Sequence, residues 1–207
     1  MSSIEDRFYG LPTTGISDAL KGFNHMNSVI KPLKESDKIA GRAFTVKIPA
    51  GDNTGILRGL READPGDILV VDGKGYTERA VAGDFVISLA QNLGLRGMVI
   101  DGAIRDIQGI HSLDFPVFCR SSTLAASVKA EKGECQVPIS CGGVSVNPGD
   151  LIVGDADGVI VIPNGKEEEI LQATLEKLKK DRTREEKYIG SREKALQYLD
   201  QVLGDSK

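Results

Sequence analysis

Three charged residues offer the clearest chemistry in the sequence: Asp84, and the pair Arg105-Asp106 that follows after twenty intervening residues. Arginine presents a planar fork of donors that can hold a carboxylate through two parallel hydrogen bonds. Aspartate is a hard oxygen ligand of the kind that Mg²⁺ prefers. Gly83-Asp84 also opens a predicted helix, and the unpaired N–H groups of a helix start favour anions. These features together predict a site for a small oxo-acid.

The segment between these residues predicts a helix and then a buried strand. Residues 85–93 carry apolar side chains at helical spacing, namely Val86, Leu89, Ala90 and Leu93. The apolar run 97–100 is typical of a buried strand, and Asp101-Gly102 predicts the turn that closes it. The charged pair follows that turn directly, so strand and helix would bring it near Asp84.

Composition bounds the class of protein. A chain of 207 residues, 40% hydrophobic and 27% charged, predicts a globular protein of one domain with room for a helical extension. The net charge of −4 argues against a nucleic-acid partner, which calls for a concentrated basic face. No apolar run approaches the roughly 18–20 residues that cross a bilayer, and the N-terminus does not read as a signal peptide. We therefore expect a cytoplasmic protein without a membrane partner.

The cysteines and histidines do not indicate a site. Cys119, Cys135 and Cys141 are odd in number and lack CxxC spacing, so we expect free, inert thiols. His25 and His111 stand in no metal-binding or triad motif. Catalysis by imidazole is therefore not expected.

The remaining elements predict an α/β layered domain that closes in an antiparallel hairpin. Helices are predicted at 14–21, with Thr14 or Gly15 near its cap, and at 54–63. Strands are predicted near 39–48, 68–71, 116–119, 144–146, 151–153 and 158–162. The sequence Pro-Gly-Asp precedes two of these strands, at 65–67 and 148–150, where a simple turn is the favoured interpretation.

The chain changes character from Lys166 onward. The segment is dense in charge, and Gly190 is predicted to divide it into two helices. The first helix carries one apolar stripe, made of Ile170, Leu171, Leu175 and Leu178. Two interpretations stay open for the charged remainder: a solvated face, or a surface that packs on a neighbouring subunit.

The sequence also resembles a known family. The stretch AGDFVISLAQNLGLRGMVIDGAIRDIQGI is similar to the signature of the class II pyruvate aldolases related to regulator of ribonuclease activity A. Two further stretches, GDNTGILRGLREADPGDILVVDGKG and VPISCGGVSVNPGDLIVGDADGVIVIP, extend the resemblance to roughly residues 10 to 165. The resemblance implies an RraA-like fold, a β/β/α swivelling-domain-like layered sandwich over 1–165. It also implies a C-terminal helical extension over 166–207 that packs on a neighbouring subunit of a homotrimer or homohexamer.

Roles for individual residues follow from the resemblance. Arg105 would bind the oxo-acid and stabilise enolate charge, and Asp106 would anchor Mg²⁺, Mn²⁺ or another divalent cation largely through waters. Asp84 would hold a catalytic water, although an N-cap role is also compatible with its position. The predicted substrate-binding set is Gly83, Phe85, Val86, Arg105, Asn53 and Lys129. For Asn53 a plain turn or capping role stays open, and for Lys129 a plain surface role.

The implied activity is metal-dependent cleavage of 4-hydroxy-2-oxo acids of the 4-hydroxy-4-methyl-2-oxoglutarate type to pyruvate, with oxaloacetate decarboxylation through the same enolate. The alternative is a binding protein that regulates a ribonuclease by contact and performs no catalysis. The resemblance further implies that an acid from a neighbour's C-terminal helix completes each active site. Asp181, Glu185 and Glu186 are the candidates in this chain.

Overall fold

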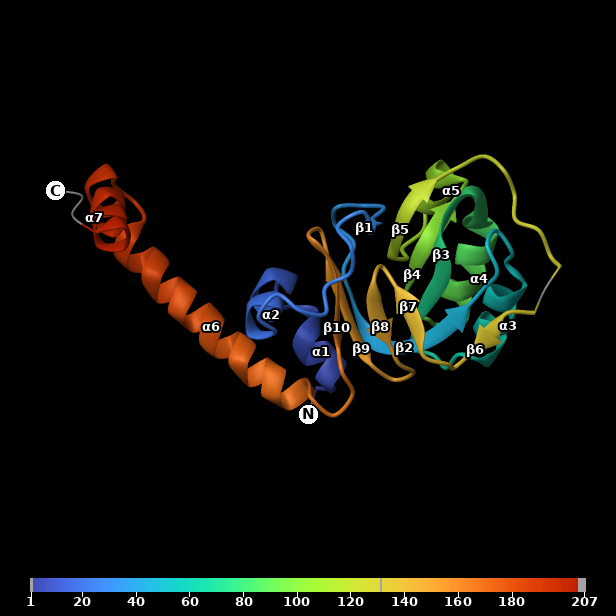
Figure 1. The fold of residues 1–207 in the computed structure, drawn as a ribbon, viewed down its shortest axis with the longest axis horizontal. Coiled ribbons are helices and arrows are strands. Elements are labelled where there is room, and N and C mark those ends of the chain that lie inside the picture. Colours follow the sequence, from blue (N-terminus) through green and yellow to red (C-terminus); the bar gives the residue numbers. More distant parts are fainter. Residues whose placement is uncertain (1, 131, 205–207) are drawn as a thin grey trace.

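The computed structural model describes residues 2–130 and 132–204. The last three residues of the predicted extension 166–207 lie outside this part. Figure 1 shows a layered domain from which a long helical arm projects away from the sheet. The N-terminal helices lie between the sheet and the arm.

The domain is built on an eight-stranded sheet in the order β1-β5-β4-β3-β2-β9-β10, with β6 paired to β2. Its strands are β1 (Lys31–Pro32), β2 (Ile39–Lys47), β3 (Ile68–Ala82), β4 (Gly97–Ile104), β5 (Val117–Ser122), β6 (Glu134–Cys135), β9 (Leu151–Asp155) and β10 (Gly158–Ile162). Strands β2 to β5 run parallel, whereas β9 joins β2 and β10 joins β9 in antiparallel register. The β9–β10 hairpin confirms the predicted closing hairpin.

Three layers follow from the alternation of apolar side chains along the central strands. Leu69 and Val71 of β3 face helices α3 (Thr54–Glu62), α4 (Asp84–Asn92) and α5 (Ile107–His111). Their neighbours Ile68 and Val70 face the small sheet of β7 (Ile139–Cys141) and β8 (Val144–Val146). Buried parallel strands are apolar on both faces for this reason. The arrangement is a β/β/α sandwich, as the family resemblance implied.

Two strands extend beyond their predicted ends. The prediction of a turn at Asp101-Gly102 is wrong, because β4 continues through both residues to Ile104. Asp101 is buried there, and its carboxylate accepts from Arg120 Nε at 2.6 Å and from the Gly142 N–H at 2.8 Å. These partners from distant segments satisfy the carboxylate, so Asp-Gly need not form a turn. Strand β3 similarly runs on from Val71 to Ala82 with three register shifts against β4.

Smaller differences concern the helices. Helix α2 (Thr13–Ala19) begins earlier than predicted, with Pro12 rather than Thr14 or Gly15 at its N-cap. In α4 the side chain of Ile87 is fully buried, whereas Leu93, predicted as apolar contact, caps the helix and is exposed. Helix α1 (Ile4–Tyr9) was not predicted.

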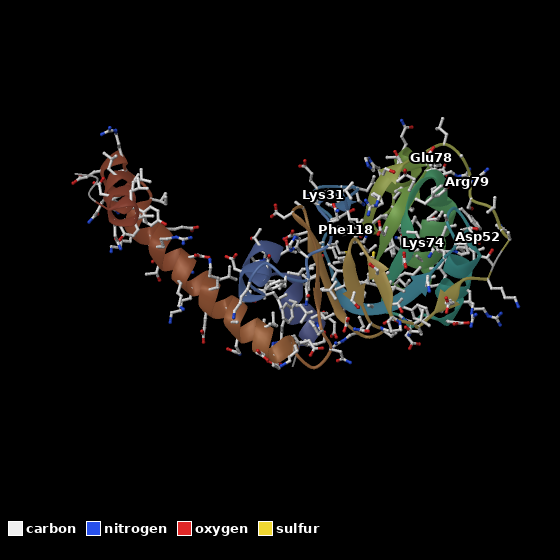
Figure 2. All side chains as sticks on the ribbon, viewed as in Figure 1. Lys31, Asp52, Lys74, Glu78, Arg79 and Phe118 are labelled. Carbon is white, nitrogen blue, oxygen red and sulfur yellow. The ribbon has the colours of Figure 1, made fainter. Side chains whose placement is uncertain are left out.

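The arm consists of α6 (Glu167–Tyr188) and α7 (Arg192–Leu203), which Gly190 separates as predicted. Ile170 and Leu171 pack with α1 and α2 over β9 and β10, but Leu175 is exposed, so the predicted stripe is buried only in part. Figure 2 shows the side chains of the outer arm pointing into open space, far from Asp52 and Arg79 at the other end of the molecule. No helix in the described part of the chain is long and apolar enough to cross a membrane.

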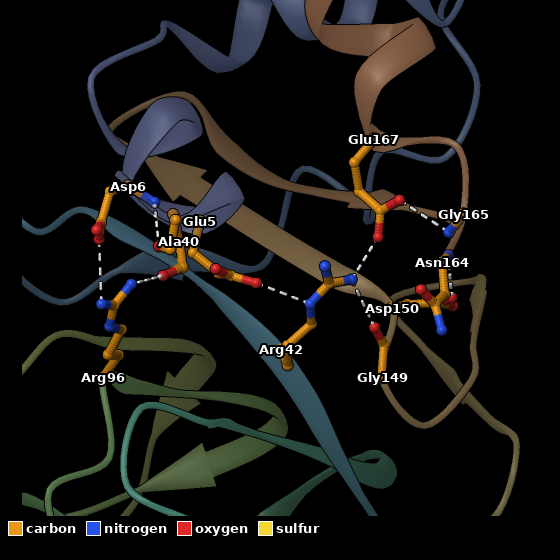
Figure 3. Close-up of polar contacts among 11 residues, drawn as sticks. Glu5, Asp6, Ala40, Arg42, Arg96, Gly149, Asp150, Asn164, Gly165 and Glu167 are labelled. Carbon is orange, nitrogen blue, oxygen red and sulfur yellow. Dashed lines mark hydrogen bonds and ion pairs between the residues drawn. The ribbon is translucent and has the colours of Figure 1, made fainter. Parts of the chain in front are cut away.

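An ion-pair network fixes the base of the arm (Figure 3). Arg42 on β2 forms two ion pairs. Its Nε atom lies 2.8 Å from Oε1 of Glu5 in α1, and its Nη1 atom pairs with Glu167 at the start of α6. Burial alone would raise the pKa of Glu5 and of Glu167. Hydrogen bonds from Arg42 and from the backbone outweigh it, so both pKa values lie below the ordinary 4.5. Both carboxylates are therefore ionised at neutral pH and hold α1 and α6 against the sheet.

Candidate active site

One cavity of about 260 Å³ gathers all the predicted catalytic, substrate-binding and metal residues, whereas the candidate acids Asp181, Glu185 and Glu186 lie outside it on α6. It lies where β3 and β4 end and α4 and α5 begin, at the carboxyl edge of parallel strands where ligands of α/β proteins commonly bind. Its predicted members are Asn53, Gly83, Asp84, Phe85, Val86, Arg105, Asp106 and Lys129. Ala80, Val81, Ala82, Ala126 and Ser127 complete the lining.

Asp84 is the first residue of α4, and Gly83 holds the N-cap position in an extended conformation. The Asp84 carboxylate accepts from the N–H of Phe85 at 2.7 Å, so it already uses one donor of the helix start. Because Gly83 occupies the N-cap position, Asp84 is not the N-cap of α4. Phe85 itself is 72% exposed at the rim of the cavity, which is unusual for an aromatic side chain.

Arg105 and Asp106 leave the end of β4 in a sharp turn. The N–H of Arg105 donates to the carbonyl of Ala82 at 3.0 Å, which ties the turn to the end of β3. Asp106 then adopts a left-handed conformation, φ 59° and ψ 41°, and starts α5. Few residues other than glycine adopt this conformation, and aspartate is among those that tolerate it. Strained backbone of this kind concentrates at functional sites.

The two side chains of the turn remain half exposed toward the cavity. Arg105 Nε lies 3.3 Å from Asp106 Oδ2, and their side chains are 44% and 43% exposed. The guanidinium keeps donors for an anionic ligand beyond this single contact, since it carries five N–H groups. A cation fork and a carboxylate are thus presented together.

Asn53 is buried, yet its Oδ1 atom has no hydrogen-bond partner among the described residues. It occupies the N-cap position of α3, but the capping bond comes from Asp52, whose Oδ1 accepts from the Thr54 N–H at 2.7 Å. An unsatisfied buried polar atom calls for an explanation, and a ligand in the cavity supplies one. Of the two interpretations, the geometry favours a binding role over a capping role.

Lys129 belongs to the segment 123–130, which crosses beside the cavity. The N–H of Val128 donates to the carbonyl oxygen of Gly51 at 2.9 Å, and the N–H of Ala130 donates to Asp52 Oδ2 at 2.5 Å. Arg79 adds a bond from Nη1 to the carbonyl of Ala126 at 2.9 Å. Sequence reasoning missed Asp52 and Arg79. An aspartate directly before the Asn-Thr helix start was the available signal for Asp52, whereas nothing local pointed to Arg79.

The chain is similar to known proteins in sequence and in fold. The family model described as RraA-like, Aldolase/RraA, matches residues 13–161. The chain belongs to this family.

Relatives in the RraA-like family are described either as aldolases or as members of a ribonuclease inhibitor family. A Halalkalibacterium halodurans protein, provisionally named 4-hydroxy-4-methyl-2-oxoglutarate aldolase, is 50% identical over 97% of this chain and 95% of its own. A Thermus thermophilus protein named 4-hydroxy-4-methyl-2-oxoglutarate aldolase is 32% identical over 73% of this chain and 92% of its own. The structure of Streptomyces coelicolor RraAS2 is described as an unusual member of the RNase ES inhibitor RraA protein family. It matches with a TM-score of 0.79 at 26% identity, covering 87% of this chain and 95% of that one.

The donor set of the cavity fits a Mg²⁺ or Mn²⁺ ion. Asp84 and Asp106 both line it, and no group of three or more His, Cys, Asp or Glu suited to a metal occurs among the described residues. Sites of this kind hold Mg²⁺ through one or two carboxylates, while water and substrate oxygens fill the remaining positions. Asp106 would therefore hold the cation, and Asp84 would hold a water beside it.

The cysteines lie outside this cavity, as does His25. Cys119 and Cys141 are buried and Cys135 is half-buried, all three as free thiols. Burial raises the pKa of Cys119 to about 11, and burial also raises the pKa of Cys141. Such thiols stay protonated near neutral pH and are poor nucleophiles, in agreement with the prediction of inert cysteines.

Proposed function

We propose that this protein is a divalent-metal-dependent aldolase. It would cleave 4-hydroxy-4-methyl-2-oxoglutarate and similar 4-hydroxy-2-oxo acids to pyruvate, and decarboxylate oxaloacetate at the same site. The observation that carries the proposal is the pairing of Arg105 with Asp106 just after the C-terminal end of β4, in one cavity with Asp84. The aldolase names of the relatives support the same class of reaction.

The groups that line the cavity would have different chemical roles. The guanidinium of Arg105 would bind the 2-oxo-carboxylate end of the substrate and hold the oxygen charge that develops as the C3–C4 bond breaks. The start of α4 adds the favourable field of a helix N-terminus for an anion. When bound, Mg²⁺ or Mn²⁺ supplies Lewis acidity toward the 2-oxo oxygen.

Proton transfer falls to Asp84. As C3 and C4 separate, the 4-hydroxyl group loses its proton and C4 becomes a carbonyl carbon. A water held by Asp84 would accept that proton and return one to C3, which completes pyruvate. Asn53 and Lys129 would orient the remainder of the substrate through its oxygens. No lysine Schiff base is needed in this scheme.

Assembly is part of the proposal. Helix α7 has no buried residue, and Leu196, Leu199, Val202 and Leu203 are exposed on it. An apolar face on a projecting arm is the sequence and structural pattern of a subunit contact. We infer a homotrimer or homohexamer in which each arm reaches a neighbour's cavity.

The three candidate acids of the arm differ in their surroundings. Asp181 pairs with Lys177 and Arg184, and Glu186 pairs with Arg182 on its own helix. Glu185 is exposed, and no ion pair to it is found within the part of the chain that the structure describes. Glu185 is therefore the acid that could enter a neighbour's site without breaking an ion pair on its own helix.

The deciding experiment is pyruvate release by the purified protein after removal of metal with EDTA. Pyruvate should form from 4-hydroxy-4-methyl-2-oxoglutarate only after Mg²⁺ or Mn²⁺ is restored. From oxaloacetate, which decarboxylates slowly by itself, it should then form faster than in the same metal solution without protein. Absence of turnover with both substrates and both metals, together with capture of an endoribonuclease in a pull-down, would replace the aldolase proposal with the regulator interpretation. The description of RraAS2 as a member of an RNase inhibitor family makes that pull-down worthwhile.

A further inference from the structure

Two glycines lie against the two carboxylates of the cavity, and each belongs to the element that carries the other acid. Gly83 immediately precedes Asp84 but packs against the Arg105-Asp106 turn. A Cβ atom there would overlap Asp106 Oδ2 and lie 3.4 Å from Asp106 Cγ and 3.3 Å from Arg105 Cγ. Gly109 lies in α5, behind Asp106, but packs against Asp84. A Cβ atom there would lie 2.7 Å from Asp84 Oδ2 and 2.9 Å from Asp84 Cβ. Neither position accepts a side chain unless something shifts.

Backbone conformation does not explain either glycine. Gly83 has φ −136° and ψ −173°, which is extended backbone that any residue adopts. Gly109 lies within a helix and is not among the residues with positive φ. Alanine is favoured over glycine by about 1 kcal/mol at such helical positions. What each glycine provides is space, and in both cases a carboxylate occupies that space.

We propose that Gly83 and Gly109 are positioning residues that set the two carboxylates of the site, Gly83 acting on Asp106 and Gly109 acting on Asp84. This inference rests on the proposed function for the roles of the two acids, but the contacts themselves do not depend on it. The start of α4 and the start of α5 interlock through these contacts. Each helix start therefore limits the space of the carboxylate that the other element carries.

The two contacts differ in what must yield. At Gly83 the overlapping atom is the far end of the Asp106 side chain, which can rotate away at little cost to folding. At Gly109 the overlap includes Asp84 Cβ, so a side chain there would also push α4 and α5 apart. Gly83→Ala should thus be nearly silent in stability but not in the site, whereas Gly109→Ala should affect both.

The roles of the two acids predict separate effects. Asp106 would anchor the cation, so Gly83→Ala should raise the Kd for Mn²⁺ at least tenfold. Asp84 would hold the water, so Gly109→Ala should leave that Kd within threefold while kcat for pyruvate release falls at least tenfold and KM changes little. Gly10→Ala is the matched control, because Gly10 has φ −91° and nothing within 4 Å of an added Cβ.

The experiment uses the full chain and measures Mn²⁺ binding by electron paramagnetic resonance, pyruvate release, and thermal unfolding. Asp84→Gly supplies the test that separates positioning from general damage, since it removes all three Asp84 atoms that Gly109→Ala would meet. In that background Gly109→Ala should lower kcat less than twofold and should no longer lower the Tm. Equal losses in both backgrounds overturn the role of Gly109.

If the wild type releases no pyruvate, the aldolase proposal fails, yet the Mn²⁺ and Tm comparisons still decide whether the glycines position the acids. Wild-type Mn²⁺ affinity in Gly83→Ala overturns the role of Gly83. A wild type that binds no Mn²⁺ overturns the assignment of the cation to Asp106, and with it the functional meaning of the Gly83 contact.

Discussion

Arg105 Nε lies 3.3 Å from Asp106 Oδ2, so two adjacent residues form an ion pair across their own peptide bond. Side chains next to each other in an extended strand point to opposite faces of the sheet. The left-handed backbone of Asp106 removes that alternation and brings both groups to one cavity. The turn at the end of β4 is therefore the element that converts sequence adjacency into a site.

Asp106→Ala should abolish most activation by divalent metal. No group of three potential metal ligands exists among the described residues to take over the cation, and loss of such charge stabilisation typically lowers turnover by ~10²-fold or more. Pyruvate release after EDTA treatment and titration with Mg²⁺ measures the effect. Wild-type turnover in this variant would show that the metal assignment is wrong.

Arg105→Lys should reduce kcat by ~10²-fold, because lysine keeps the charge but cannot make the planar two-point contact. An effect on kcat means that the arginine serves the developing enolate, whereas an effect on KM alone means uniform binding of the carboxylate. Arg58→Lys is the control, since Arg58 is also about half exposed and pairs with a single carboxylate, Glu62. An unchanged kcat/KM would remove Arg105 from the site.

Asn53→Ala should separate binding from stability. The amide oxygen makes no hydrogen bond within the described part of the protein, so its removal should change the free energy of unfolding by less than about 1 kcal/mol. If the amide orients the substrate, KM should rise roughly tenfold, the equivalent of one lost hydrogen bond. A large loss of stability with unchanged KM would restore the structural interpretation of Asn53.

Local pattern was sufficient for much of the fold. The strand at Ile39–Lys47 and the helix from Asp84 follow from apolar residues at strand and helix spacing. Asp101-Gly102 shows where local pattern fails. Its turn propensity is overridden by Arg120 and Gly142, and neither partner is close in sequence. The polar second half of β3 was likewise not predicted, because a strand without apolar alternation carries no sequence signal.

The residues of the candidate site also differ in whether local sequence identifies them. Arg105, Asp106 and Asp84 are identifiable because their chemistry is carried by the residue types themselves. Gly109 is not, because its importance lies in the Asp84 carboxylate that packs against it in three dimensions. Asp52 is intermediate, since its capping position is local but its bond to the Ala130 N–H is not.

Arg42→Met should loosen the base of the arm in a pH-dependent way. Glu5 and Glu167 have folded-state pKa values below the ordinary 4.5. Their contribution to stability is therefore complete above pH 4.5 and is lost as pH falls through the lower folded values. At pH 7 the variant should lose about 2 kcal/mol, between the values for exposed and buried ion pairs.

Urea unfolding at pH 7 and in the acid range measures this effect. The difference between wild type and Arg42→Met should shrink on acidification, while Arg58→Met, which breaks an exposed pair, should cost less than about 1 kcal/mol at either pH. A difference that stays constant from pH 7 to pH 3 would mean that the network owes nothing to its ionised carboxylates.

Truncation after Leu178 tests the arm itself. Ile170 and Leu171, which pack on the domain, are retained, and Leu178 still contacts Gly15 of α2. Tyr188 is buried further along α6, but its ring lies 5.1 Å from that of Tyr198, so its burial belongs to the α6–α7 junction and not to the domain. The truncated protein should therefore fold and bind Mn²⁺ like the wild type.

Its activity should nevertheless fall to a small fraction of the wild-type value, because the acid that completes a neighbour's site is removed with Asp181, Glu185 and Glu186. Light scattering should show a trimer or hexamer for the full chain and a smaller species, or a less stable assembly, for the truncated one. Glu185→Gln in the full chain is the matched variant, and it should lower kcat without changing the assembly. A monomeric wild type, or full activity in the truncated chain, would exclude a site shared between subunits.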